Sequence, residues 1–348
     1  MKALVIHEQG VVNVEEVLEP SIADHDVKIK VKACGICGSD IPRVLNNKAH
    51  YYPIILGHEF SGVVAEVGSN VHNVKIGEHV VGVPLIPCHQ CEDCVEGNYS
   101  LCKNYTFIGS RRSGAMAEYV VIPAQNVVKI DDSINFCDAA FIEPITVALH
   151  ALKQNHHKPN KKVAILGMGT IGALTAQAVK KIGAENITII VRNEKYNSLI
   201  EKIGACSIVD TSKSTWKDDI NKITQGRGFD FVYESAGSVQ TMHQAFQIAA
   251  NKAHICFIGT PKESLCFTIQ EWEQMNRKEF YLTGSWMSYS GAFPGTEWVD
   301  AANLLRNGDI KIYPEMIHKK IPLNSSVDIF SEYGKSGYVI GRTLITMT

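Results

Sequence analysis

Four cysteines stand close together in one short, polar stretch of the chain. Cys88, Cys91, Cys94 and Cys102 follow the spacing CxxCxxCx7C within fifteen residues. The stretch has no hydrophobic periodicity, so it offers no core in which four unrelated thiols could be buried. Four thiolates on so short a loop can bind one tetrahedral Zn²⁺ and leave no open coordination position. We therefore expect a structural zinc site, with an iron–sulfur cluster as the alternative because ferredoxin loops also carry cysteines at two-residue gaps.

A second set of possible metal ligands is dispersed along the chain. Cys37 lies in the sequence Gly-Ile-Cys-Gly-Ser-Asp, His58 and Glu59 are neighbours, and Glu143 stands before a proline. One thiolate, one imidazole and carboxylates from separate segments, with water completing the shell, are the components of an open catalytic zinc site. The spacing leaves two other interpretations open: a redox CxxC pair of Cys34 and Cys37, and a histidine that is satisfied in the core.

A glycine-rich turn follows an apolar run in the middle of the chain. Residues 162–166 read Lys-Val-Ala-Ile-Leu, and the next six residues match GxGxxG and lead into a helical pattern. In this strand–turn–helix context the first glycine makes the turn, the second admits a pyrophosphate and the third allows close packing of helix and strand. The turn predicts a dinucleotide site formed by Gly167, Gly169, Thr170, Ile171 and Gly172.

The residue that discriminates NAD from NADP usually stands at the end of the second strand of such a domain. The apolar run 187–191 continues here as Arg192-Asn193 and has no acid at its tip. A carboxylate would bond the ribose 2′-hydroxyl, whereas Arg192 could pair with a 2′-phosphate. This favours NADP over NAD, although Arg192 could equally be a solvated charge at a strand end.

The elements that must position these residues show two kinds of sequence pattern. The chain has 348 residues, about the length of two domains. Its first third has short alternating apolar runs, at 27–31 and 60–67 for example, which predict a β domain. From residue 161, strand-like runs alternate with helical stretches such as 171–182, which indicates βαβ units on a parallel sheet. These later runs lie at 163–166, 187–191, 229–233 and 254–258, and a final strand is expected at 338–345.

This pattern predicts a divided first domain. We expect residues 1–152 and 289–348 to form the β-rich domain that carries the four-cysteine loop, and residues 153–288 to form the nucleotide-binding domain inserted into it. Hydrophobic residues make up 45% and charged residues 20% of the chain, and the net charge is −2. These values favour a packed globular protein and disfavour nucleic acid or a membrane as partner. Ten unevenly placed cysteines and acids within Met1–Pro20 favour a cytosolic location.

Taken in order along the chain, these motifs resemble the zinc-dependent medium-chain dehydrogenase/reductase superfamily. The resemblance implies an α/β protein with a GroES-like β-rich catalytic domain and a Rossmann domain, two zinc ions per chain, NAD or NADP, and a homodimer or homotetramer. It implies that Cys37, His58 and Glu143 bind the catalytic zinc. Glu59 would either bind the same ion or hydrogen-bond to its ligands.

Finer motifs resemble the polyol branch of that superfamily. A glutamate at position 143 is similar to polyol and threonine dehydrogenases, and the segments 50–53, 107–112 and 284–289 are similar to enzymes of sugar-alcohol phosphates. The resemblance implies hydride transfer between NAD(P) and a substrate similar to galactitol 1-phosphate. Sorbitol or L-iditol, and arabitol phosphate, are alternative substrates. A catalytically silent cofactor-binding protein on the same fold is an alternative of another class.

Two expectations concern the substrate. Ser39 is the candidate for passing the substrate proton outward, because a hydroxyl both accepts and donates. The histidine that often continues this relay in the superfamily is replaced by Pro42, so the proton must leave by another route, and Ser39 could also be a turn serine. Arg43, Arg111 and Arg112 are the candidates for binding a substrate phosphate through their guanidinium forks. Each of the three could instead be a solvated surface charge.

Overall fold

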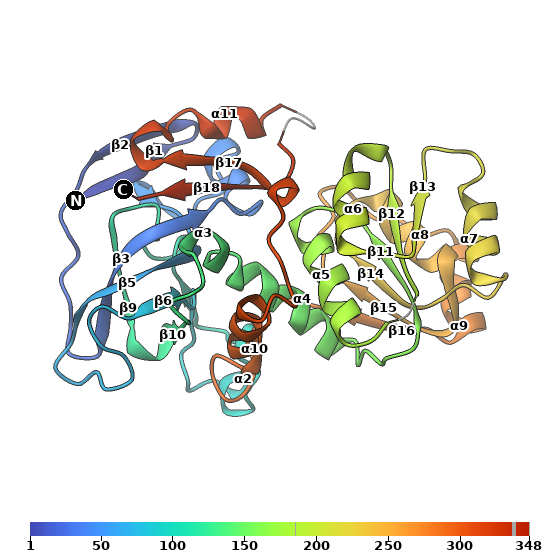
Figure 1. The fold of residues 1–348 in the computed structure, drawn as a ribbon, viewed down its shortest axis with the longest axis horizontal. Helices are drawn as coiled ribbons and strands as arrows, with labels where there is room; N and C mark the ends of the chain where they lie inside the picture. The colour runs from blue at the N-terminus through green and yellow to red at the C-terminus, as the bar shows by residue number, and fades with distance from the viewer. Residues whose placement is uncertain (185, 336–338, 348) are drawn as a thin grey trace. The chain divides into compact units, whose positions relative to one another are not determined.

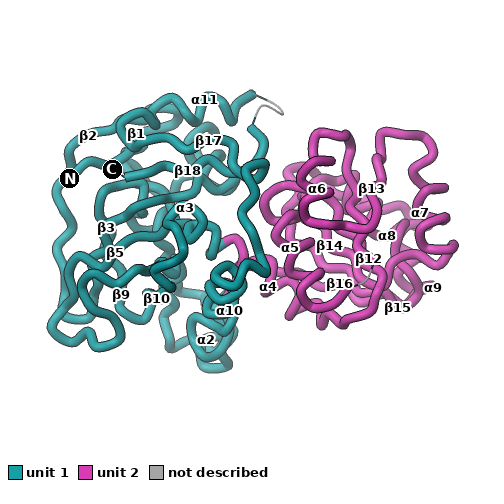
Figure 2. Tube along the Cα trace, in the orientation of Figure 1, with its two compact units in different colours: residues 1–143, 289–348 teal, residues 144–288 magenta. Residues whose placement is uncertain are grey.

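The chain folds into two compact units. The structure, a computed structural model, describes residues 1–184, 186–335 and 339–347. Residues 1–143 and 289–348 form the first unit, and residues 144–288 form the second (Figure 2). The first unit is therefore made from two distant parts of the sequence, with the second unit inserted between them.

The first unit is built mainly of β-strands (Figure 1). Its largest sheet has the order β10-β6-β5-β3-β18-β17, with β9 also paired to β3, and two smaller sheets have the orders β2-β1-β4 and β7-β8. The strands are β1 (Lys2–Glu8), β2 (Val11–Glu16), β3 (Asp26–Gly35), β4 (Ile54–Ile55), β5 (Glu59–Val67), β6 (His79–Gly82), β7 (Leu85–Ile86), β8 (Thr106–Phe107), β9 (Tyr119–Pro123), β10 (Val127–Lys129), β17 (Ile317–Pro322) and β18 (Arg342–Thr346). The helices are α1 (Ile41–Leu45), α2 (Glu92–Val95), α3 (Phe136–Ala139), α10 (Thr296–Arg306) and α11 (Ile329–Tyr333).

Alternation of buried and exposed side chains explains strand β3. Val27, Ile29, Val31 and Ala33 are fully buried, while the residues between them are at least partly exposed. This period of two matches a strand with one face on the core. The strand predicted at 27–31 is confirmed and continues to Gly35. That extension carries the chain directly to the Cys37 segment.

The second unit is a parallel sheet with helices. Its six strands, all paired in parallel, have the order β13-β12-β11-β14-β15-β16, which is 3-2-1-4-5-6 when they are counted from β11. This is the doubly wound dinucleotide-binding order, in which the strand order reverses between the first and fourth strands. The strands are β11 (Lys162–Leu166), β12 (Asn186–Val191), β13 (Ser207–Asp210), β14 (Phe229–Glu234), β15 (Ala249–Phe257) and β16 (Tyr281–Gly284). The helices are α4 (Ile142–Gln154), which starts in the first unit, α5 (Thr170–Lys181), α6 (Asn197–Ile203), α7 (Trp216–Thr224), α8 (Val239–Ile248) and α9 (Ile269–Lys278).

The strands and helix predicted in this part of the chain are confirmed, with shifted ends. The apolar run expected at 254–258 is part of β15, which begins five residues earlier at Ala249. The small residues Ala249, Ala250 and Ala253 gave no strong strand signal, although all three are buried in the sheet. The final strand expected at 338–345 is β18, which begins at Arg342, and Tyr338 lies outside the described residues.

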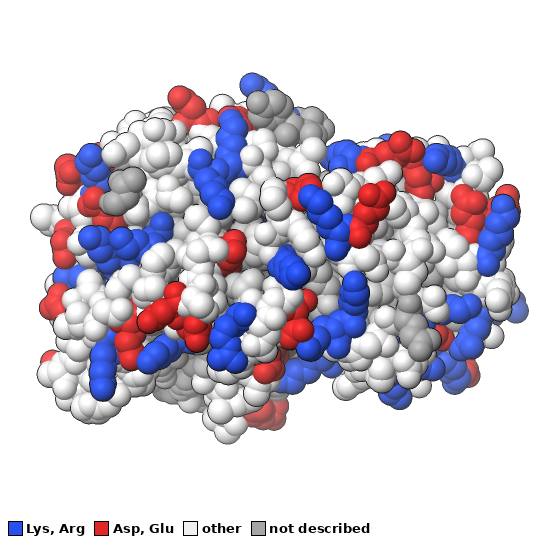
Figure 3. All heavy atoms as spheres, in the orientation of Figure 1, with Lys and Arg blue, Asp and Glu red and all other residues white. Residues whose placement is uncertain are grey.

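Charges of both signs are mixed over the face drawn in Figure 3, where lysines and arginines lie among aspartates and glutamates. Among the described residues, no helix is both long enough and apolar enough to cross a membrane.

Candidate active site

The pairing of β3 with β5 brings Cys37 and His58 together. The two strands are antiparallel, and Gly35 at the end of β3 lies opposite Glu59 at the start of β5. Cys37 follows β3 by two residues and His58 immediately precedes β5. One ligand atom each from Cys37, His58 and Glu59 lies within 4.8 Å of the others. Sheet register therefore brings Cys37 to the neighbouring pair of His58 and Glu59.

Glycines leave room for this cluster. A Cβ atom on Gly35 would lie 2.5 Å from Glu59 Oε2, and one on Gly57 would lie 2.6 Å from Cys34 Sγ. Gly57 also has a φ of +101°, which side chains rarely tolerate. A larger residue at either position would displace a group at or next to the cluster.

Asp40 is a buried carboxylate that the sequence interpretation did not single out. Its Oδ2 accepts a hydrogen bond of 3.0 Å from the Cys37 amide, and its Oδ1 lies 3.6 Å from His58 Nδ1. The Arg43 guanidinium lies 3.4 Å from the same Oδ1. A carboxylate in this position orients the thiol loop through its hydrogen bond and lies beside the imidazole ring. The signal was present, because Asp40 closes the Gly-Ile-Cys-Gly-Ser-Asp motif.

Arg342, on the last strand, is the second residue that sequence reasoning missed. Its Nη2 lies 3.0 Å from Glu59 Oε1, and its Nη1 donates to the Ile36 carbonyl at 3.1 Å. Burial raises the pKa of Glu59 to about 8, while the Arg342 charge opposes that rise. The ion pair thus holds Oε1 of Glu59. No local pattern marks an arginine so far along the chain as a neighbour of Glu59.

The cluster fits a bound zinc ion. Among the described residues, Glu59 Oε2 and His58 Nδ1 are buried without a hydrogen-bond partner. A buried carboxylate oxygen without a partner is costly unless a cation or a donor satisfies it. A thiolate, an imidazole and a carboxylate are the donor types of catalytic zinc sites. The types of donor atom and the unsatisfied Glu59 oxygen therefore both fit a bound zinc ion.

Glu143 lies in the first turn of α4 and belongs to the same electrostatic environment. Burial, together with the charge of Glu59, raises the pKa of Glu143 to about 7, while the charges of His58 and Arg342 oppose the rise. Glu143 is not part of the group of three whose donor atoms lie within 4.8 Å of one another. The structure thus brings Glu143 near the cluster, with Glu59 in the closer position.

The four cysteines of the 88–102 segment converge as their spacing predicts. One sulfur atom from each lies within 4.8 Å of the others, and Cys88 Sγ is 4.0 Å from Cys94 Sγ. Zinc–sulfur bonds of ~2.3 Å give a tetrahedron with edges of roughly 3.8 Å. Backbone amides of Gln90 and Cys91 lower the pKa of Cys88 to about 6. The segment therefore fits a closed tetrahedral metal site.

Ser39, Arg43 and Arg111 lie around the Cys37 cluster. Arg43 Nη1 donates to the Ser39 carbonyl at 2.7 Å and to Ser39 Oγ at 3.1 Å. The Arg111 guanidinium lies over the Tyr105 ring at 4.5 Å. Partial burial lowers the pKa of His50, and the charges of Arg111 and Arg43 lower it further. The two arginines and this histidine therefore share one electropositive region.

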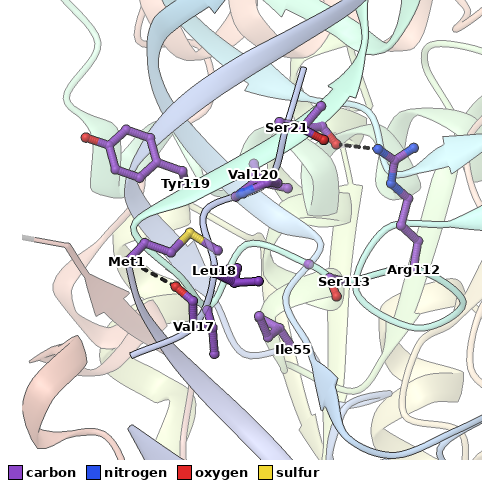
Figure 4. A pocket seen from close by; sticks show the side chains of 12 residues that line it. Met1, Val17, Leu18, Ser21, Ile55, Arg112, Ser113, Tyr119 and Val120 are labelled. Atoms are coloured by element: carbon purple, nitrogen blue, oxygen red, sulfur yellow. Dashed lines mark hydrogen bonds between the residues drawn. The ribbon is translucent and has the colours of Figure 1, made fainter. Parts of the chain in front are cut away.

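Arg112 faces elsewhere. Its Nη2 donates to the Val121 carbonyl at 3.0 Å, and the residue lines a cavity of about 500 Å³ in the first unit. Figure 4 shows this cavity, with Arg112 at one side and Met1 hydrogen-bonded to Val17 at the other. The cavity is lined by none of the cluster residues. Only Arg43 and Arg111 of the three arginines are thus placed in the region of the metal cluster.

A second cavity, of about 400 Å³, lies at the carboxyl ends of β11, β12 and β14. Gly167 and Gly169 line it, while Thr170, Ile171 and Gly172 form the first turn of α5 beside it. A Cβ on Gly167 would lie 2.9 Å from that of Ala236, whereas one on Gly169 would meet nothing within 4 Å. The turn is thus closed on the sheet side and open above the helix N-terminus, where a pyrophosphate binds.

Two cations line this nucleotide cavity. Arg192 and Lys195 both contribute to its wall, and no acid occurs among the described residues that line it. Sequence reasoning found Arg192 and missed Lys195. Below the cavity, Glu234 accepts hydrogen bonds of 2.9 Å from the amides of Ala236 and Gly237, which fixes the loop after β14.

Comparisons with known proteins agree with this geometry. The family described as "Alcohol dehydrogenase GroES-like domain" matches residues 23–132, and "Zinc-binding dehydrogenase" matches residues 170–303. The chain is 40% identical over 320 residues to galactitol 1-phosphate 5-dehydrogenase of Escherichia coli (strain K12), which covers 92% of each chain. It is 34% identical over 317 residues to D-arabitol-phosphate dehydrogenase of Enterococcus avium, which covers 90% of this chain and 88% of the relative.

Solved structures give the same result. The crystal structure of galactitol-1-phosphate dehydrogenase from Escherichia coli matches with a TM-score of 0.95 and 37% identity, over 99% of this chain and all of that chain. A protein described as a zinc-binding dehydrogenase from Sinorhizobium meliloti 1021, bound to NADP, matches with a TM-score of 0.89 and 31% identity, over 99% and 98%. These matches confirm the predicted resemblance and the predicted combination of a GroES-like with a Rossmann-type fold.

Proposed function

Because the chain belongs to the zinc-binding dehydrogenase family with a GroES-like domain, we propose that it interconverts a sugar-alcohol phosphate and the corresponding keto-sugar phosphate. The protein is an oxidoreductase of CH–OH groups that uses zinc and NAD or NADP. The observation that carries the proposal is the group of Cys37, His58 and Glu59, whose donor atoms lie within 4.8 Å of one another. Arg43, a candidate for binding the substrate phosphate, lies beside this group, 3.4 Å from Asp40.

Within this proposal, Cys37, His58 and Glu59 would hold the catalytic zinc, and Glu143 would approach it as a ligand or through water. Zinc bound there supplies a Lewis acid that stabilises negative charge on the substrate oxygen in both directions of the reaction. Asp40 keeps the Cys37 loop in place and lies beside the His58 ring, and Arg342 keeps Glu59 in place. Cys88, Cys91, Cys94 and Cys102 would hold the second, structural zinc.

Ser39 would move the substrate proton. Its hydroxyl oxygen accepts a hydrogen bond from Arg43, which leaves the Ser39 O–H free to donate elsewhere. Arg43 also lies close enough to His50 to lower the pKa of that imidazole. With Pro42 in the place of the usual relay histidine, the proton would leave Ser39 by another route, and Arg43 would orient the Ser39 hydroxyl without carrying the proton, because a guanidinium has no acceptor atom.

A substrate phosphate would bind between Arg43 and Arg111. Both arginines act on His50, so their charges converge on one region, and the Arg111 guanidinium lies over the Tyr105 ring. A guanidinium in a fixed orientation can bind two phosphate oxygens at once. This arrangement favours a substrate similar to galactitol 1-phosphate, with arabitol phosphate as a substrate of the same class and sorbitol or L-iditol as unphosphorylated alternatives.

The nucleotide cavity would accept NADP. Arg192 and Lys195 line its wall where the adenosine ribose of a dinucleotide lies in a doubly wound fold. Two cations there can neutralise a 2′-phosphate, and no described lining residue is an acid that would repel it.

Three further expectations remain part of the proposal. The first unit would be the catalytic domain and the second the cofactor domain, close to the predicted 1–152 with 289–348 and 153–288. Ten cysteines that form no disulfide favour a reducing compartment such as the cytosol. A homodimer or homotetramer is expected from the resemblance alone.

Kinetics with matched substrates and variants test the proposal. Phosphorylated and free galactitol, arabitol and sorbitol are assayed with NAD and NADP. We expect Arg111→Ala to lower kcat/KM for a phosphorylated substrate by roughly 10- to 100-fold, the value of a charged hydrogen bond, and to leave that for the free polyol nearly unchanged. Arg112→Ala is the matched control and should affect neither. Equal effects of Arg111→Ala on both substrates would contradict a phosphate site at this position.

A further inference from the structure

Glu234 is a buried carboxylate at the carboxyl end of β14, beneath the nucleotide cavity. The residue is fully buried and is not one of the described residues that line the cavity. Its Oε1 accepts three hydrogen bonds, from the amides of Ala236 and Gly237 at 2.9 Å each and from Thr241 Oγ1 at 2.7 Å. One carboxylate oxygen therefore holds both the loop at residues 235–238 and the first turn of α8.

The backbone of Glu234 holds the next loop of the sheet in the same way. Its carbonyl accepts hydrogen bonds from the amides of Ile258, at 2.9 Å, and Gly259, at 3.0 Å. A Cβ on Gly259 would lie 2.3 Å from the Gly237 nitrogen and 2.7 Å from Glu234 Oε2. Only a glycine lets the backbone approach so closely. Glu234 therefore joins the loops that follow β14 and β15.

The loop after β14 is also packed against the glycine turn. The amide and the Oγ of Ser235 both donate to the Leu166 carbonyl, each at 3.0 Å. A Cβ on Gly167 would lie 2.9 Å from the Ala236 Cβ, and one on Gly172 would lie 2.9 Å from Ser235 Oγ. The position of the 235–238 loop is thus fixed relative to the turn that is predicted to bind the pyrophosphate.

This loop stands where a dinucleotide must pass. Ser235, Ala236 and Ser238 contribute to the wall of the nucleotide cavity. The loop follows β14, and the strand order of the sheet reverses between β11 and β14. In a doubly wound fold the dinucleotide binds across this point. A wall that is already ordered lowers the entropic cost of binding, so the affinity for the nucleotide depends on how firmly the loop is held.

We infer that Glu234 is a positioning residue for the nucleotide. It acts through the 235–238 loop and does not touch the nucleotide itself. The carboxylate holds the loop amides and Thr241, and the carbonyl of the same residue holds the loop after β15. This inference rests on the use of the cavity for NAD or NADP, and the experiment below separates the two.

Two measurements on Glu234→Ala test the inference. Hydrogen–deuterium exchange of the nucleotide-free protein reports on the loop, and the amides of Ala236 and Gly237 should exchange at least about 10-fold faster than in the wild type, because both lose their acceptor. Titration with NADPH and NADH, followed by nucleotide fluorescence, reports on binding. The Kd should rise about 10-fold, the size of one lost hydrogen bond to a charged group, with the number of sites per chain unchanged. A protein that is only less stable would instead lose sites at an unchanged Kd.

Two further variants serve as control and rescue. Asp230 lies near the amino end of β14, where its Oδ2 accepts a hydrogen bond of 3.1 Å from the Lys162 amide. Asp230→Ala is therefore the matched control, and it should leave the Kd and the exchange of the two loop amides unchanged. Glu234→Gln keeps an oxygen that can accept the loop amides and should restore most of the affinity.

The outcomes distinguish the inference from its premise. A wild type that binds neither NADPH nor NADH would contradict the assignment of the cavity. If the wild type binds and Glu234→Ala keeps the same Kd, the inference is wrong even where the amides exchange faster, because the loop would then not position the nucleotide. Unchanged exchange of both amides would overturn the role of Glu234 in holding the loop. An equal loss of affinity in Asp230→Ala, or no rescue by Glu234→Gln, would also overturn it.

Discussion

The two candidate metal sites of the first unit are built in opposite ways. The four-cysteine site comes from one stretch of fifteen residues, and backbone amides favour the thiolate of Cys88. The Cys37 site takes its groups from β5, α4, β18 and the segment after β3, and burial raises the pKa of both of its glutamates. A closed set of thiolates suits a metal that only holds structure, whereas buried carboxylates near an open site suit a metal that exchanges ligands.

The largest expected effect is a separation of activity from stability. We expect Cys37→Ser to lower kcat by at least about 100-fold, because a direct ligand matters more than the groups that orient it, and to leave the unfolding temperature close to that of the wild type. Cys94→Ser should instead destabilise the protein by about 4 kcal/mol, the size typical of losing a structural metal. Zinc content, kcat and thermal unfolding of both variants check this. Equal loss of stability in both would remove the distinction between the sites.

The next effect concerns the buried ion pair. Arg342→Gln leaves Glu59 buried without its counter-charge, so we expect a loss of stability of about 3 to 5 kcal/mol in the metal-free protein at a pH above about 8, where Glu59 is ionised. Activity should fall roughly 10- to 100-fold, since Glu59 is no longer oriented. Arg342→Lys should restore part of both. Denaturant unfolding and kcat/KM measure these changes, and a variant with wild-type activity would show that Glu59 does not need Arg342.

A smaller effect is expected from adding one methyl group at Gly35. A Cβ on Gly35 would meet Glu59 Oε2, whereas one on Gly38 would meet nothing within 4 Å. Gly35→Ala should therefore cost about 1 to 3 kcal/mol, the usual cost of overpacking, and weaken zinc binding at the Cys37 site. Gly38→Ala serves as the control in the same loop. Competition with a chelator measures the affinity, and identical affinities in both variants would contradict the placement of Glu59.

The last expected effect is a dependence of stability on pH in the metal-free protein. Glu59 has a pKa of about 8 and Glu143 of about 7 in the folded chain, against 4.5 in the unfolded chain. Because both folded pKa values are raised, the folded state binds more protons, and its stability should fall as the pH rises from about 4.5 to 8. Zinc should abolish this slope by stabilising the carboxylates. Urea unfolding at several pH values, with and without zinc, tests it, and a flat profile without zinc would contradict it.

The same contrast explains what the sequence could predict. The cysteine site and the glycine turn are local, so spacing and a strand–turn–helix context were sufficient to find Cys88 and Gly167. Cys37, His58 and Glu59 were recognised through resemblance, because only the register of β3 with β5 brings them together. Arg342 had no sequence signal, since it reaches Glu59 through the pairing of β18 with β3.

Other differences between the predictions and the structure come from the direction in which side chains point. Arg111 and Arg112 are neighbours in sequence, yet Arg111 stacks on Tyr105 and Arg112 turns to Val121. Spacing cannot choose between them, because the turn after β8 points consecutive side chains in different directions. The predicted strand ends were also imprecise where a strand begins with small residues such as Ala249 and not with branched ones.

Stepwise removal of zinc is the most direct test of the account. A chelator is added in increments to protein that holds two zinc ions per chain, and the remaining zinc, kcat and circular dichroism are followed together. We expect the first ion to leave from the Cys37 site, with all activity lost, the fold unchanged and the second ion retained by the four cysteines. Activity that persists after one ion per chain has been removed, or simultaneous loss of both ions with unfolding, would contradict the assignment of a catalytic and a structural site.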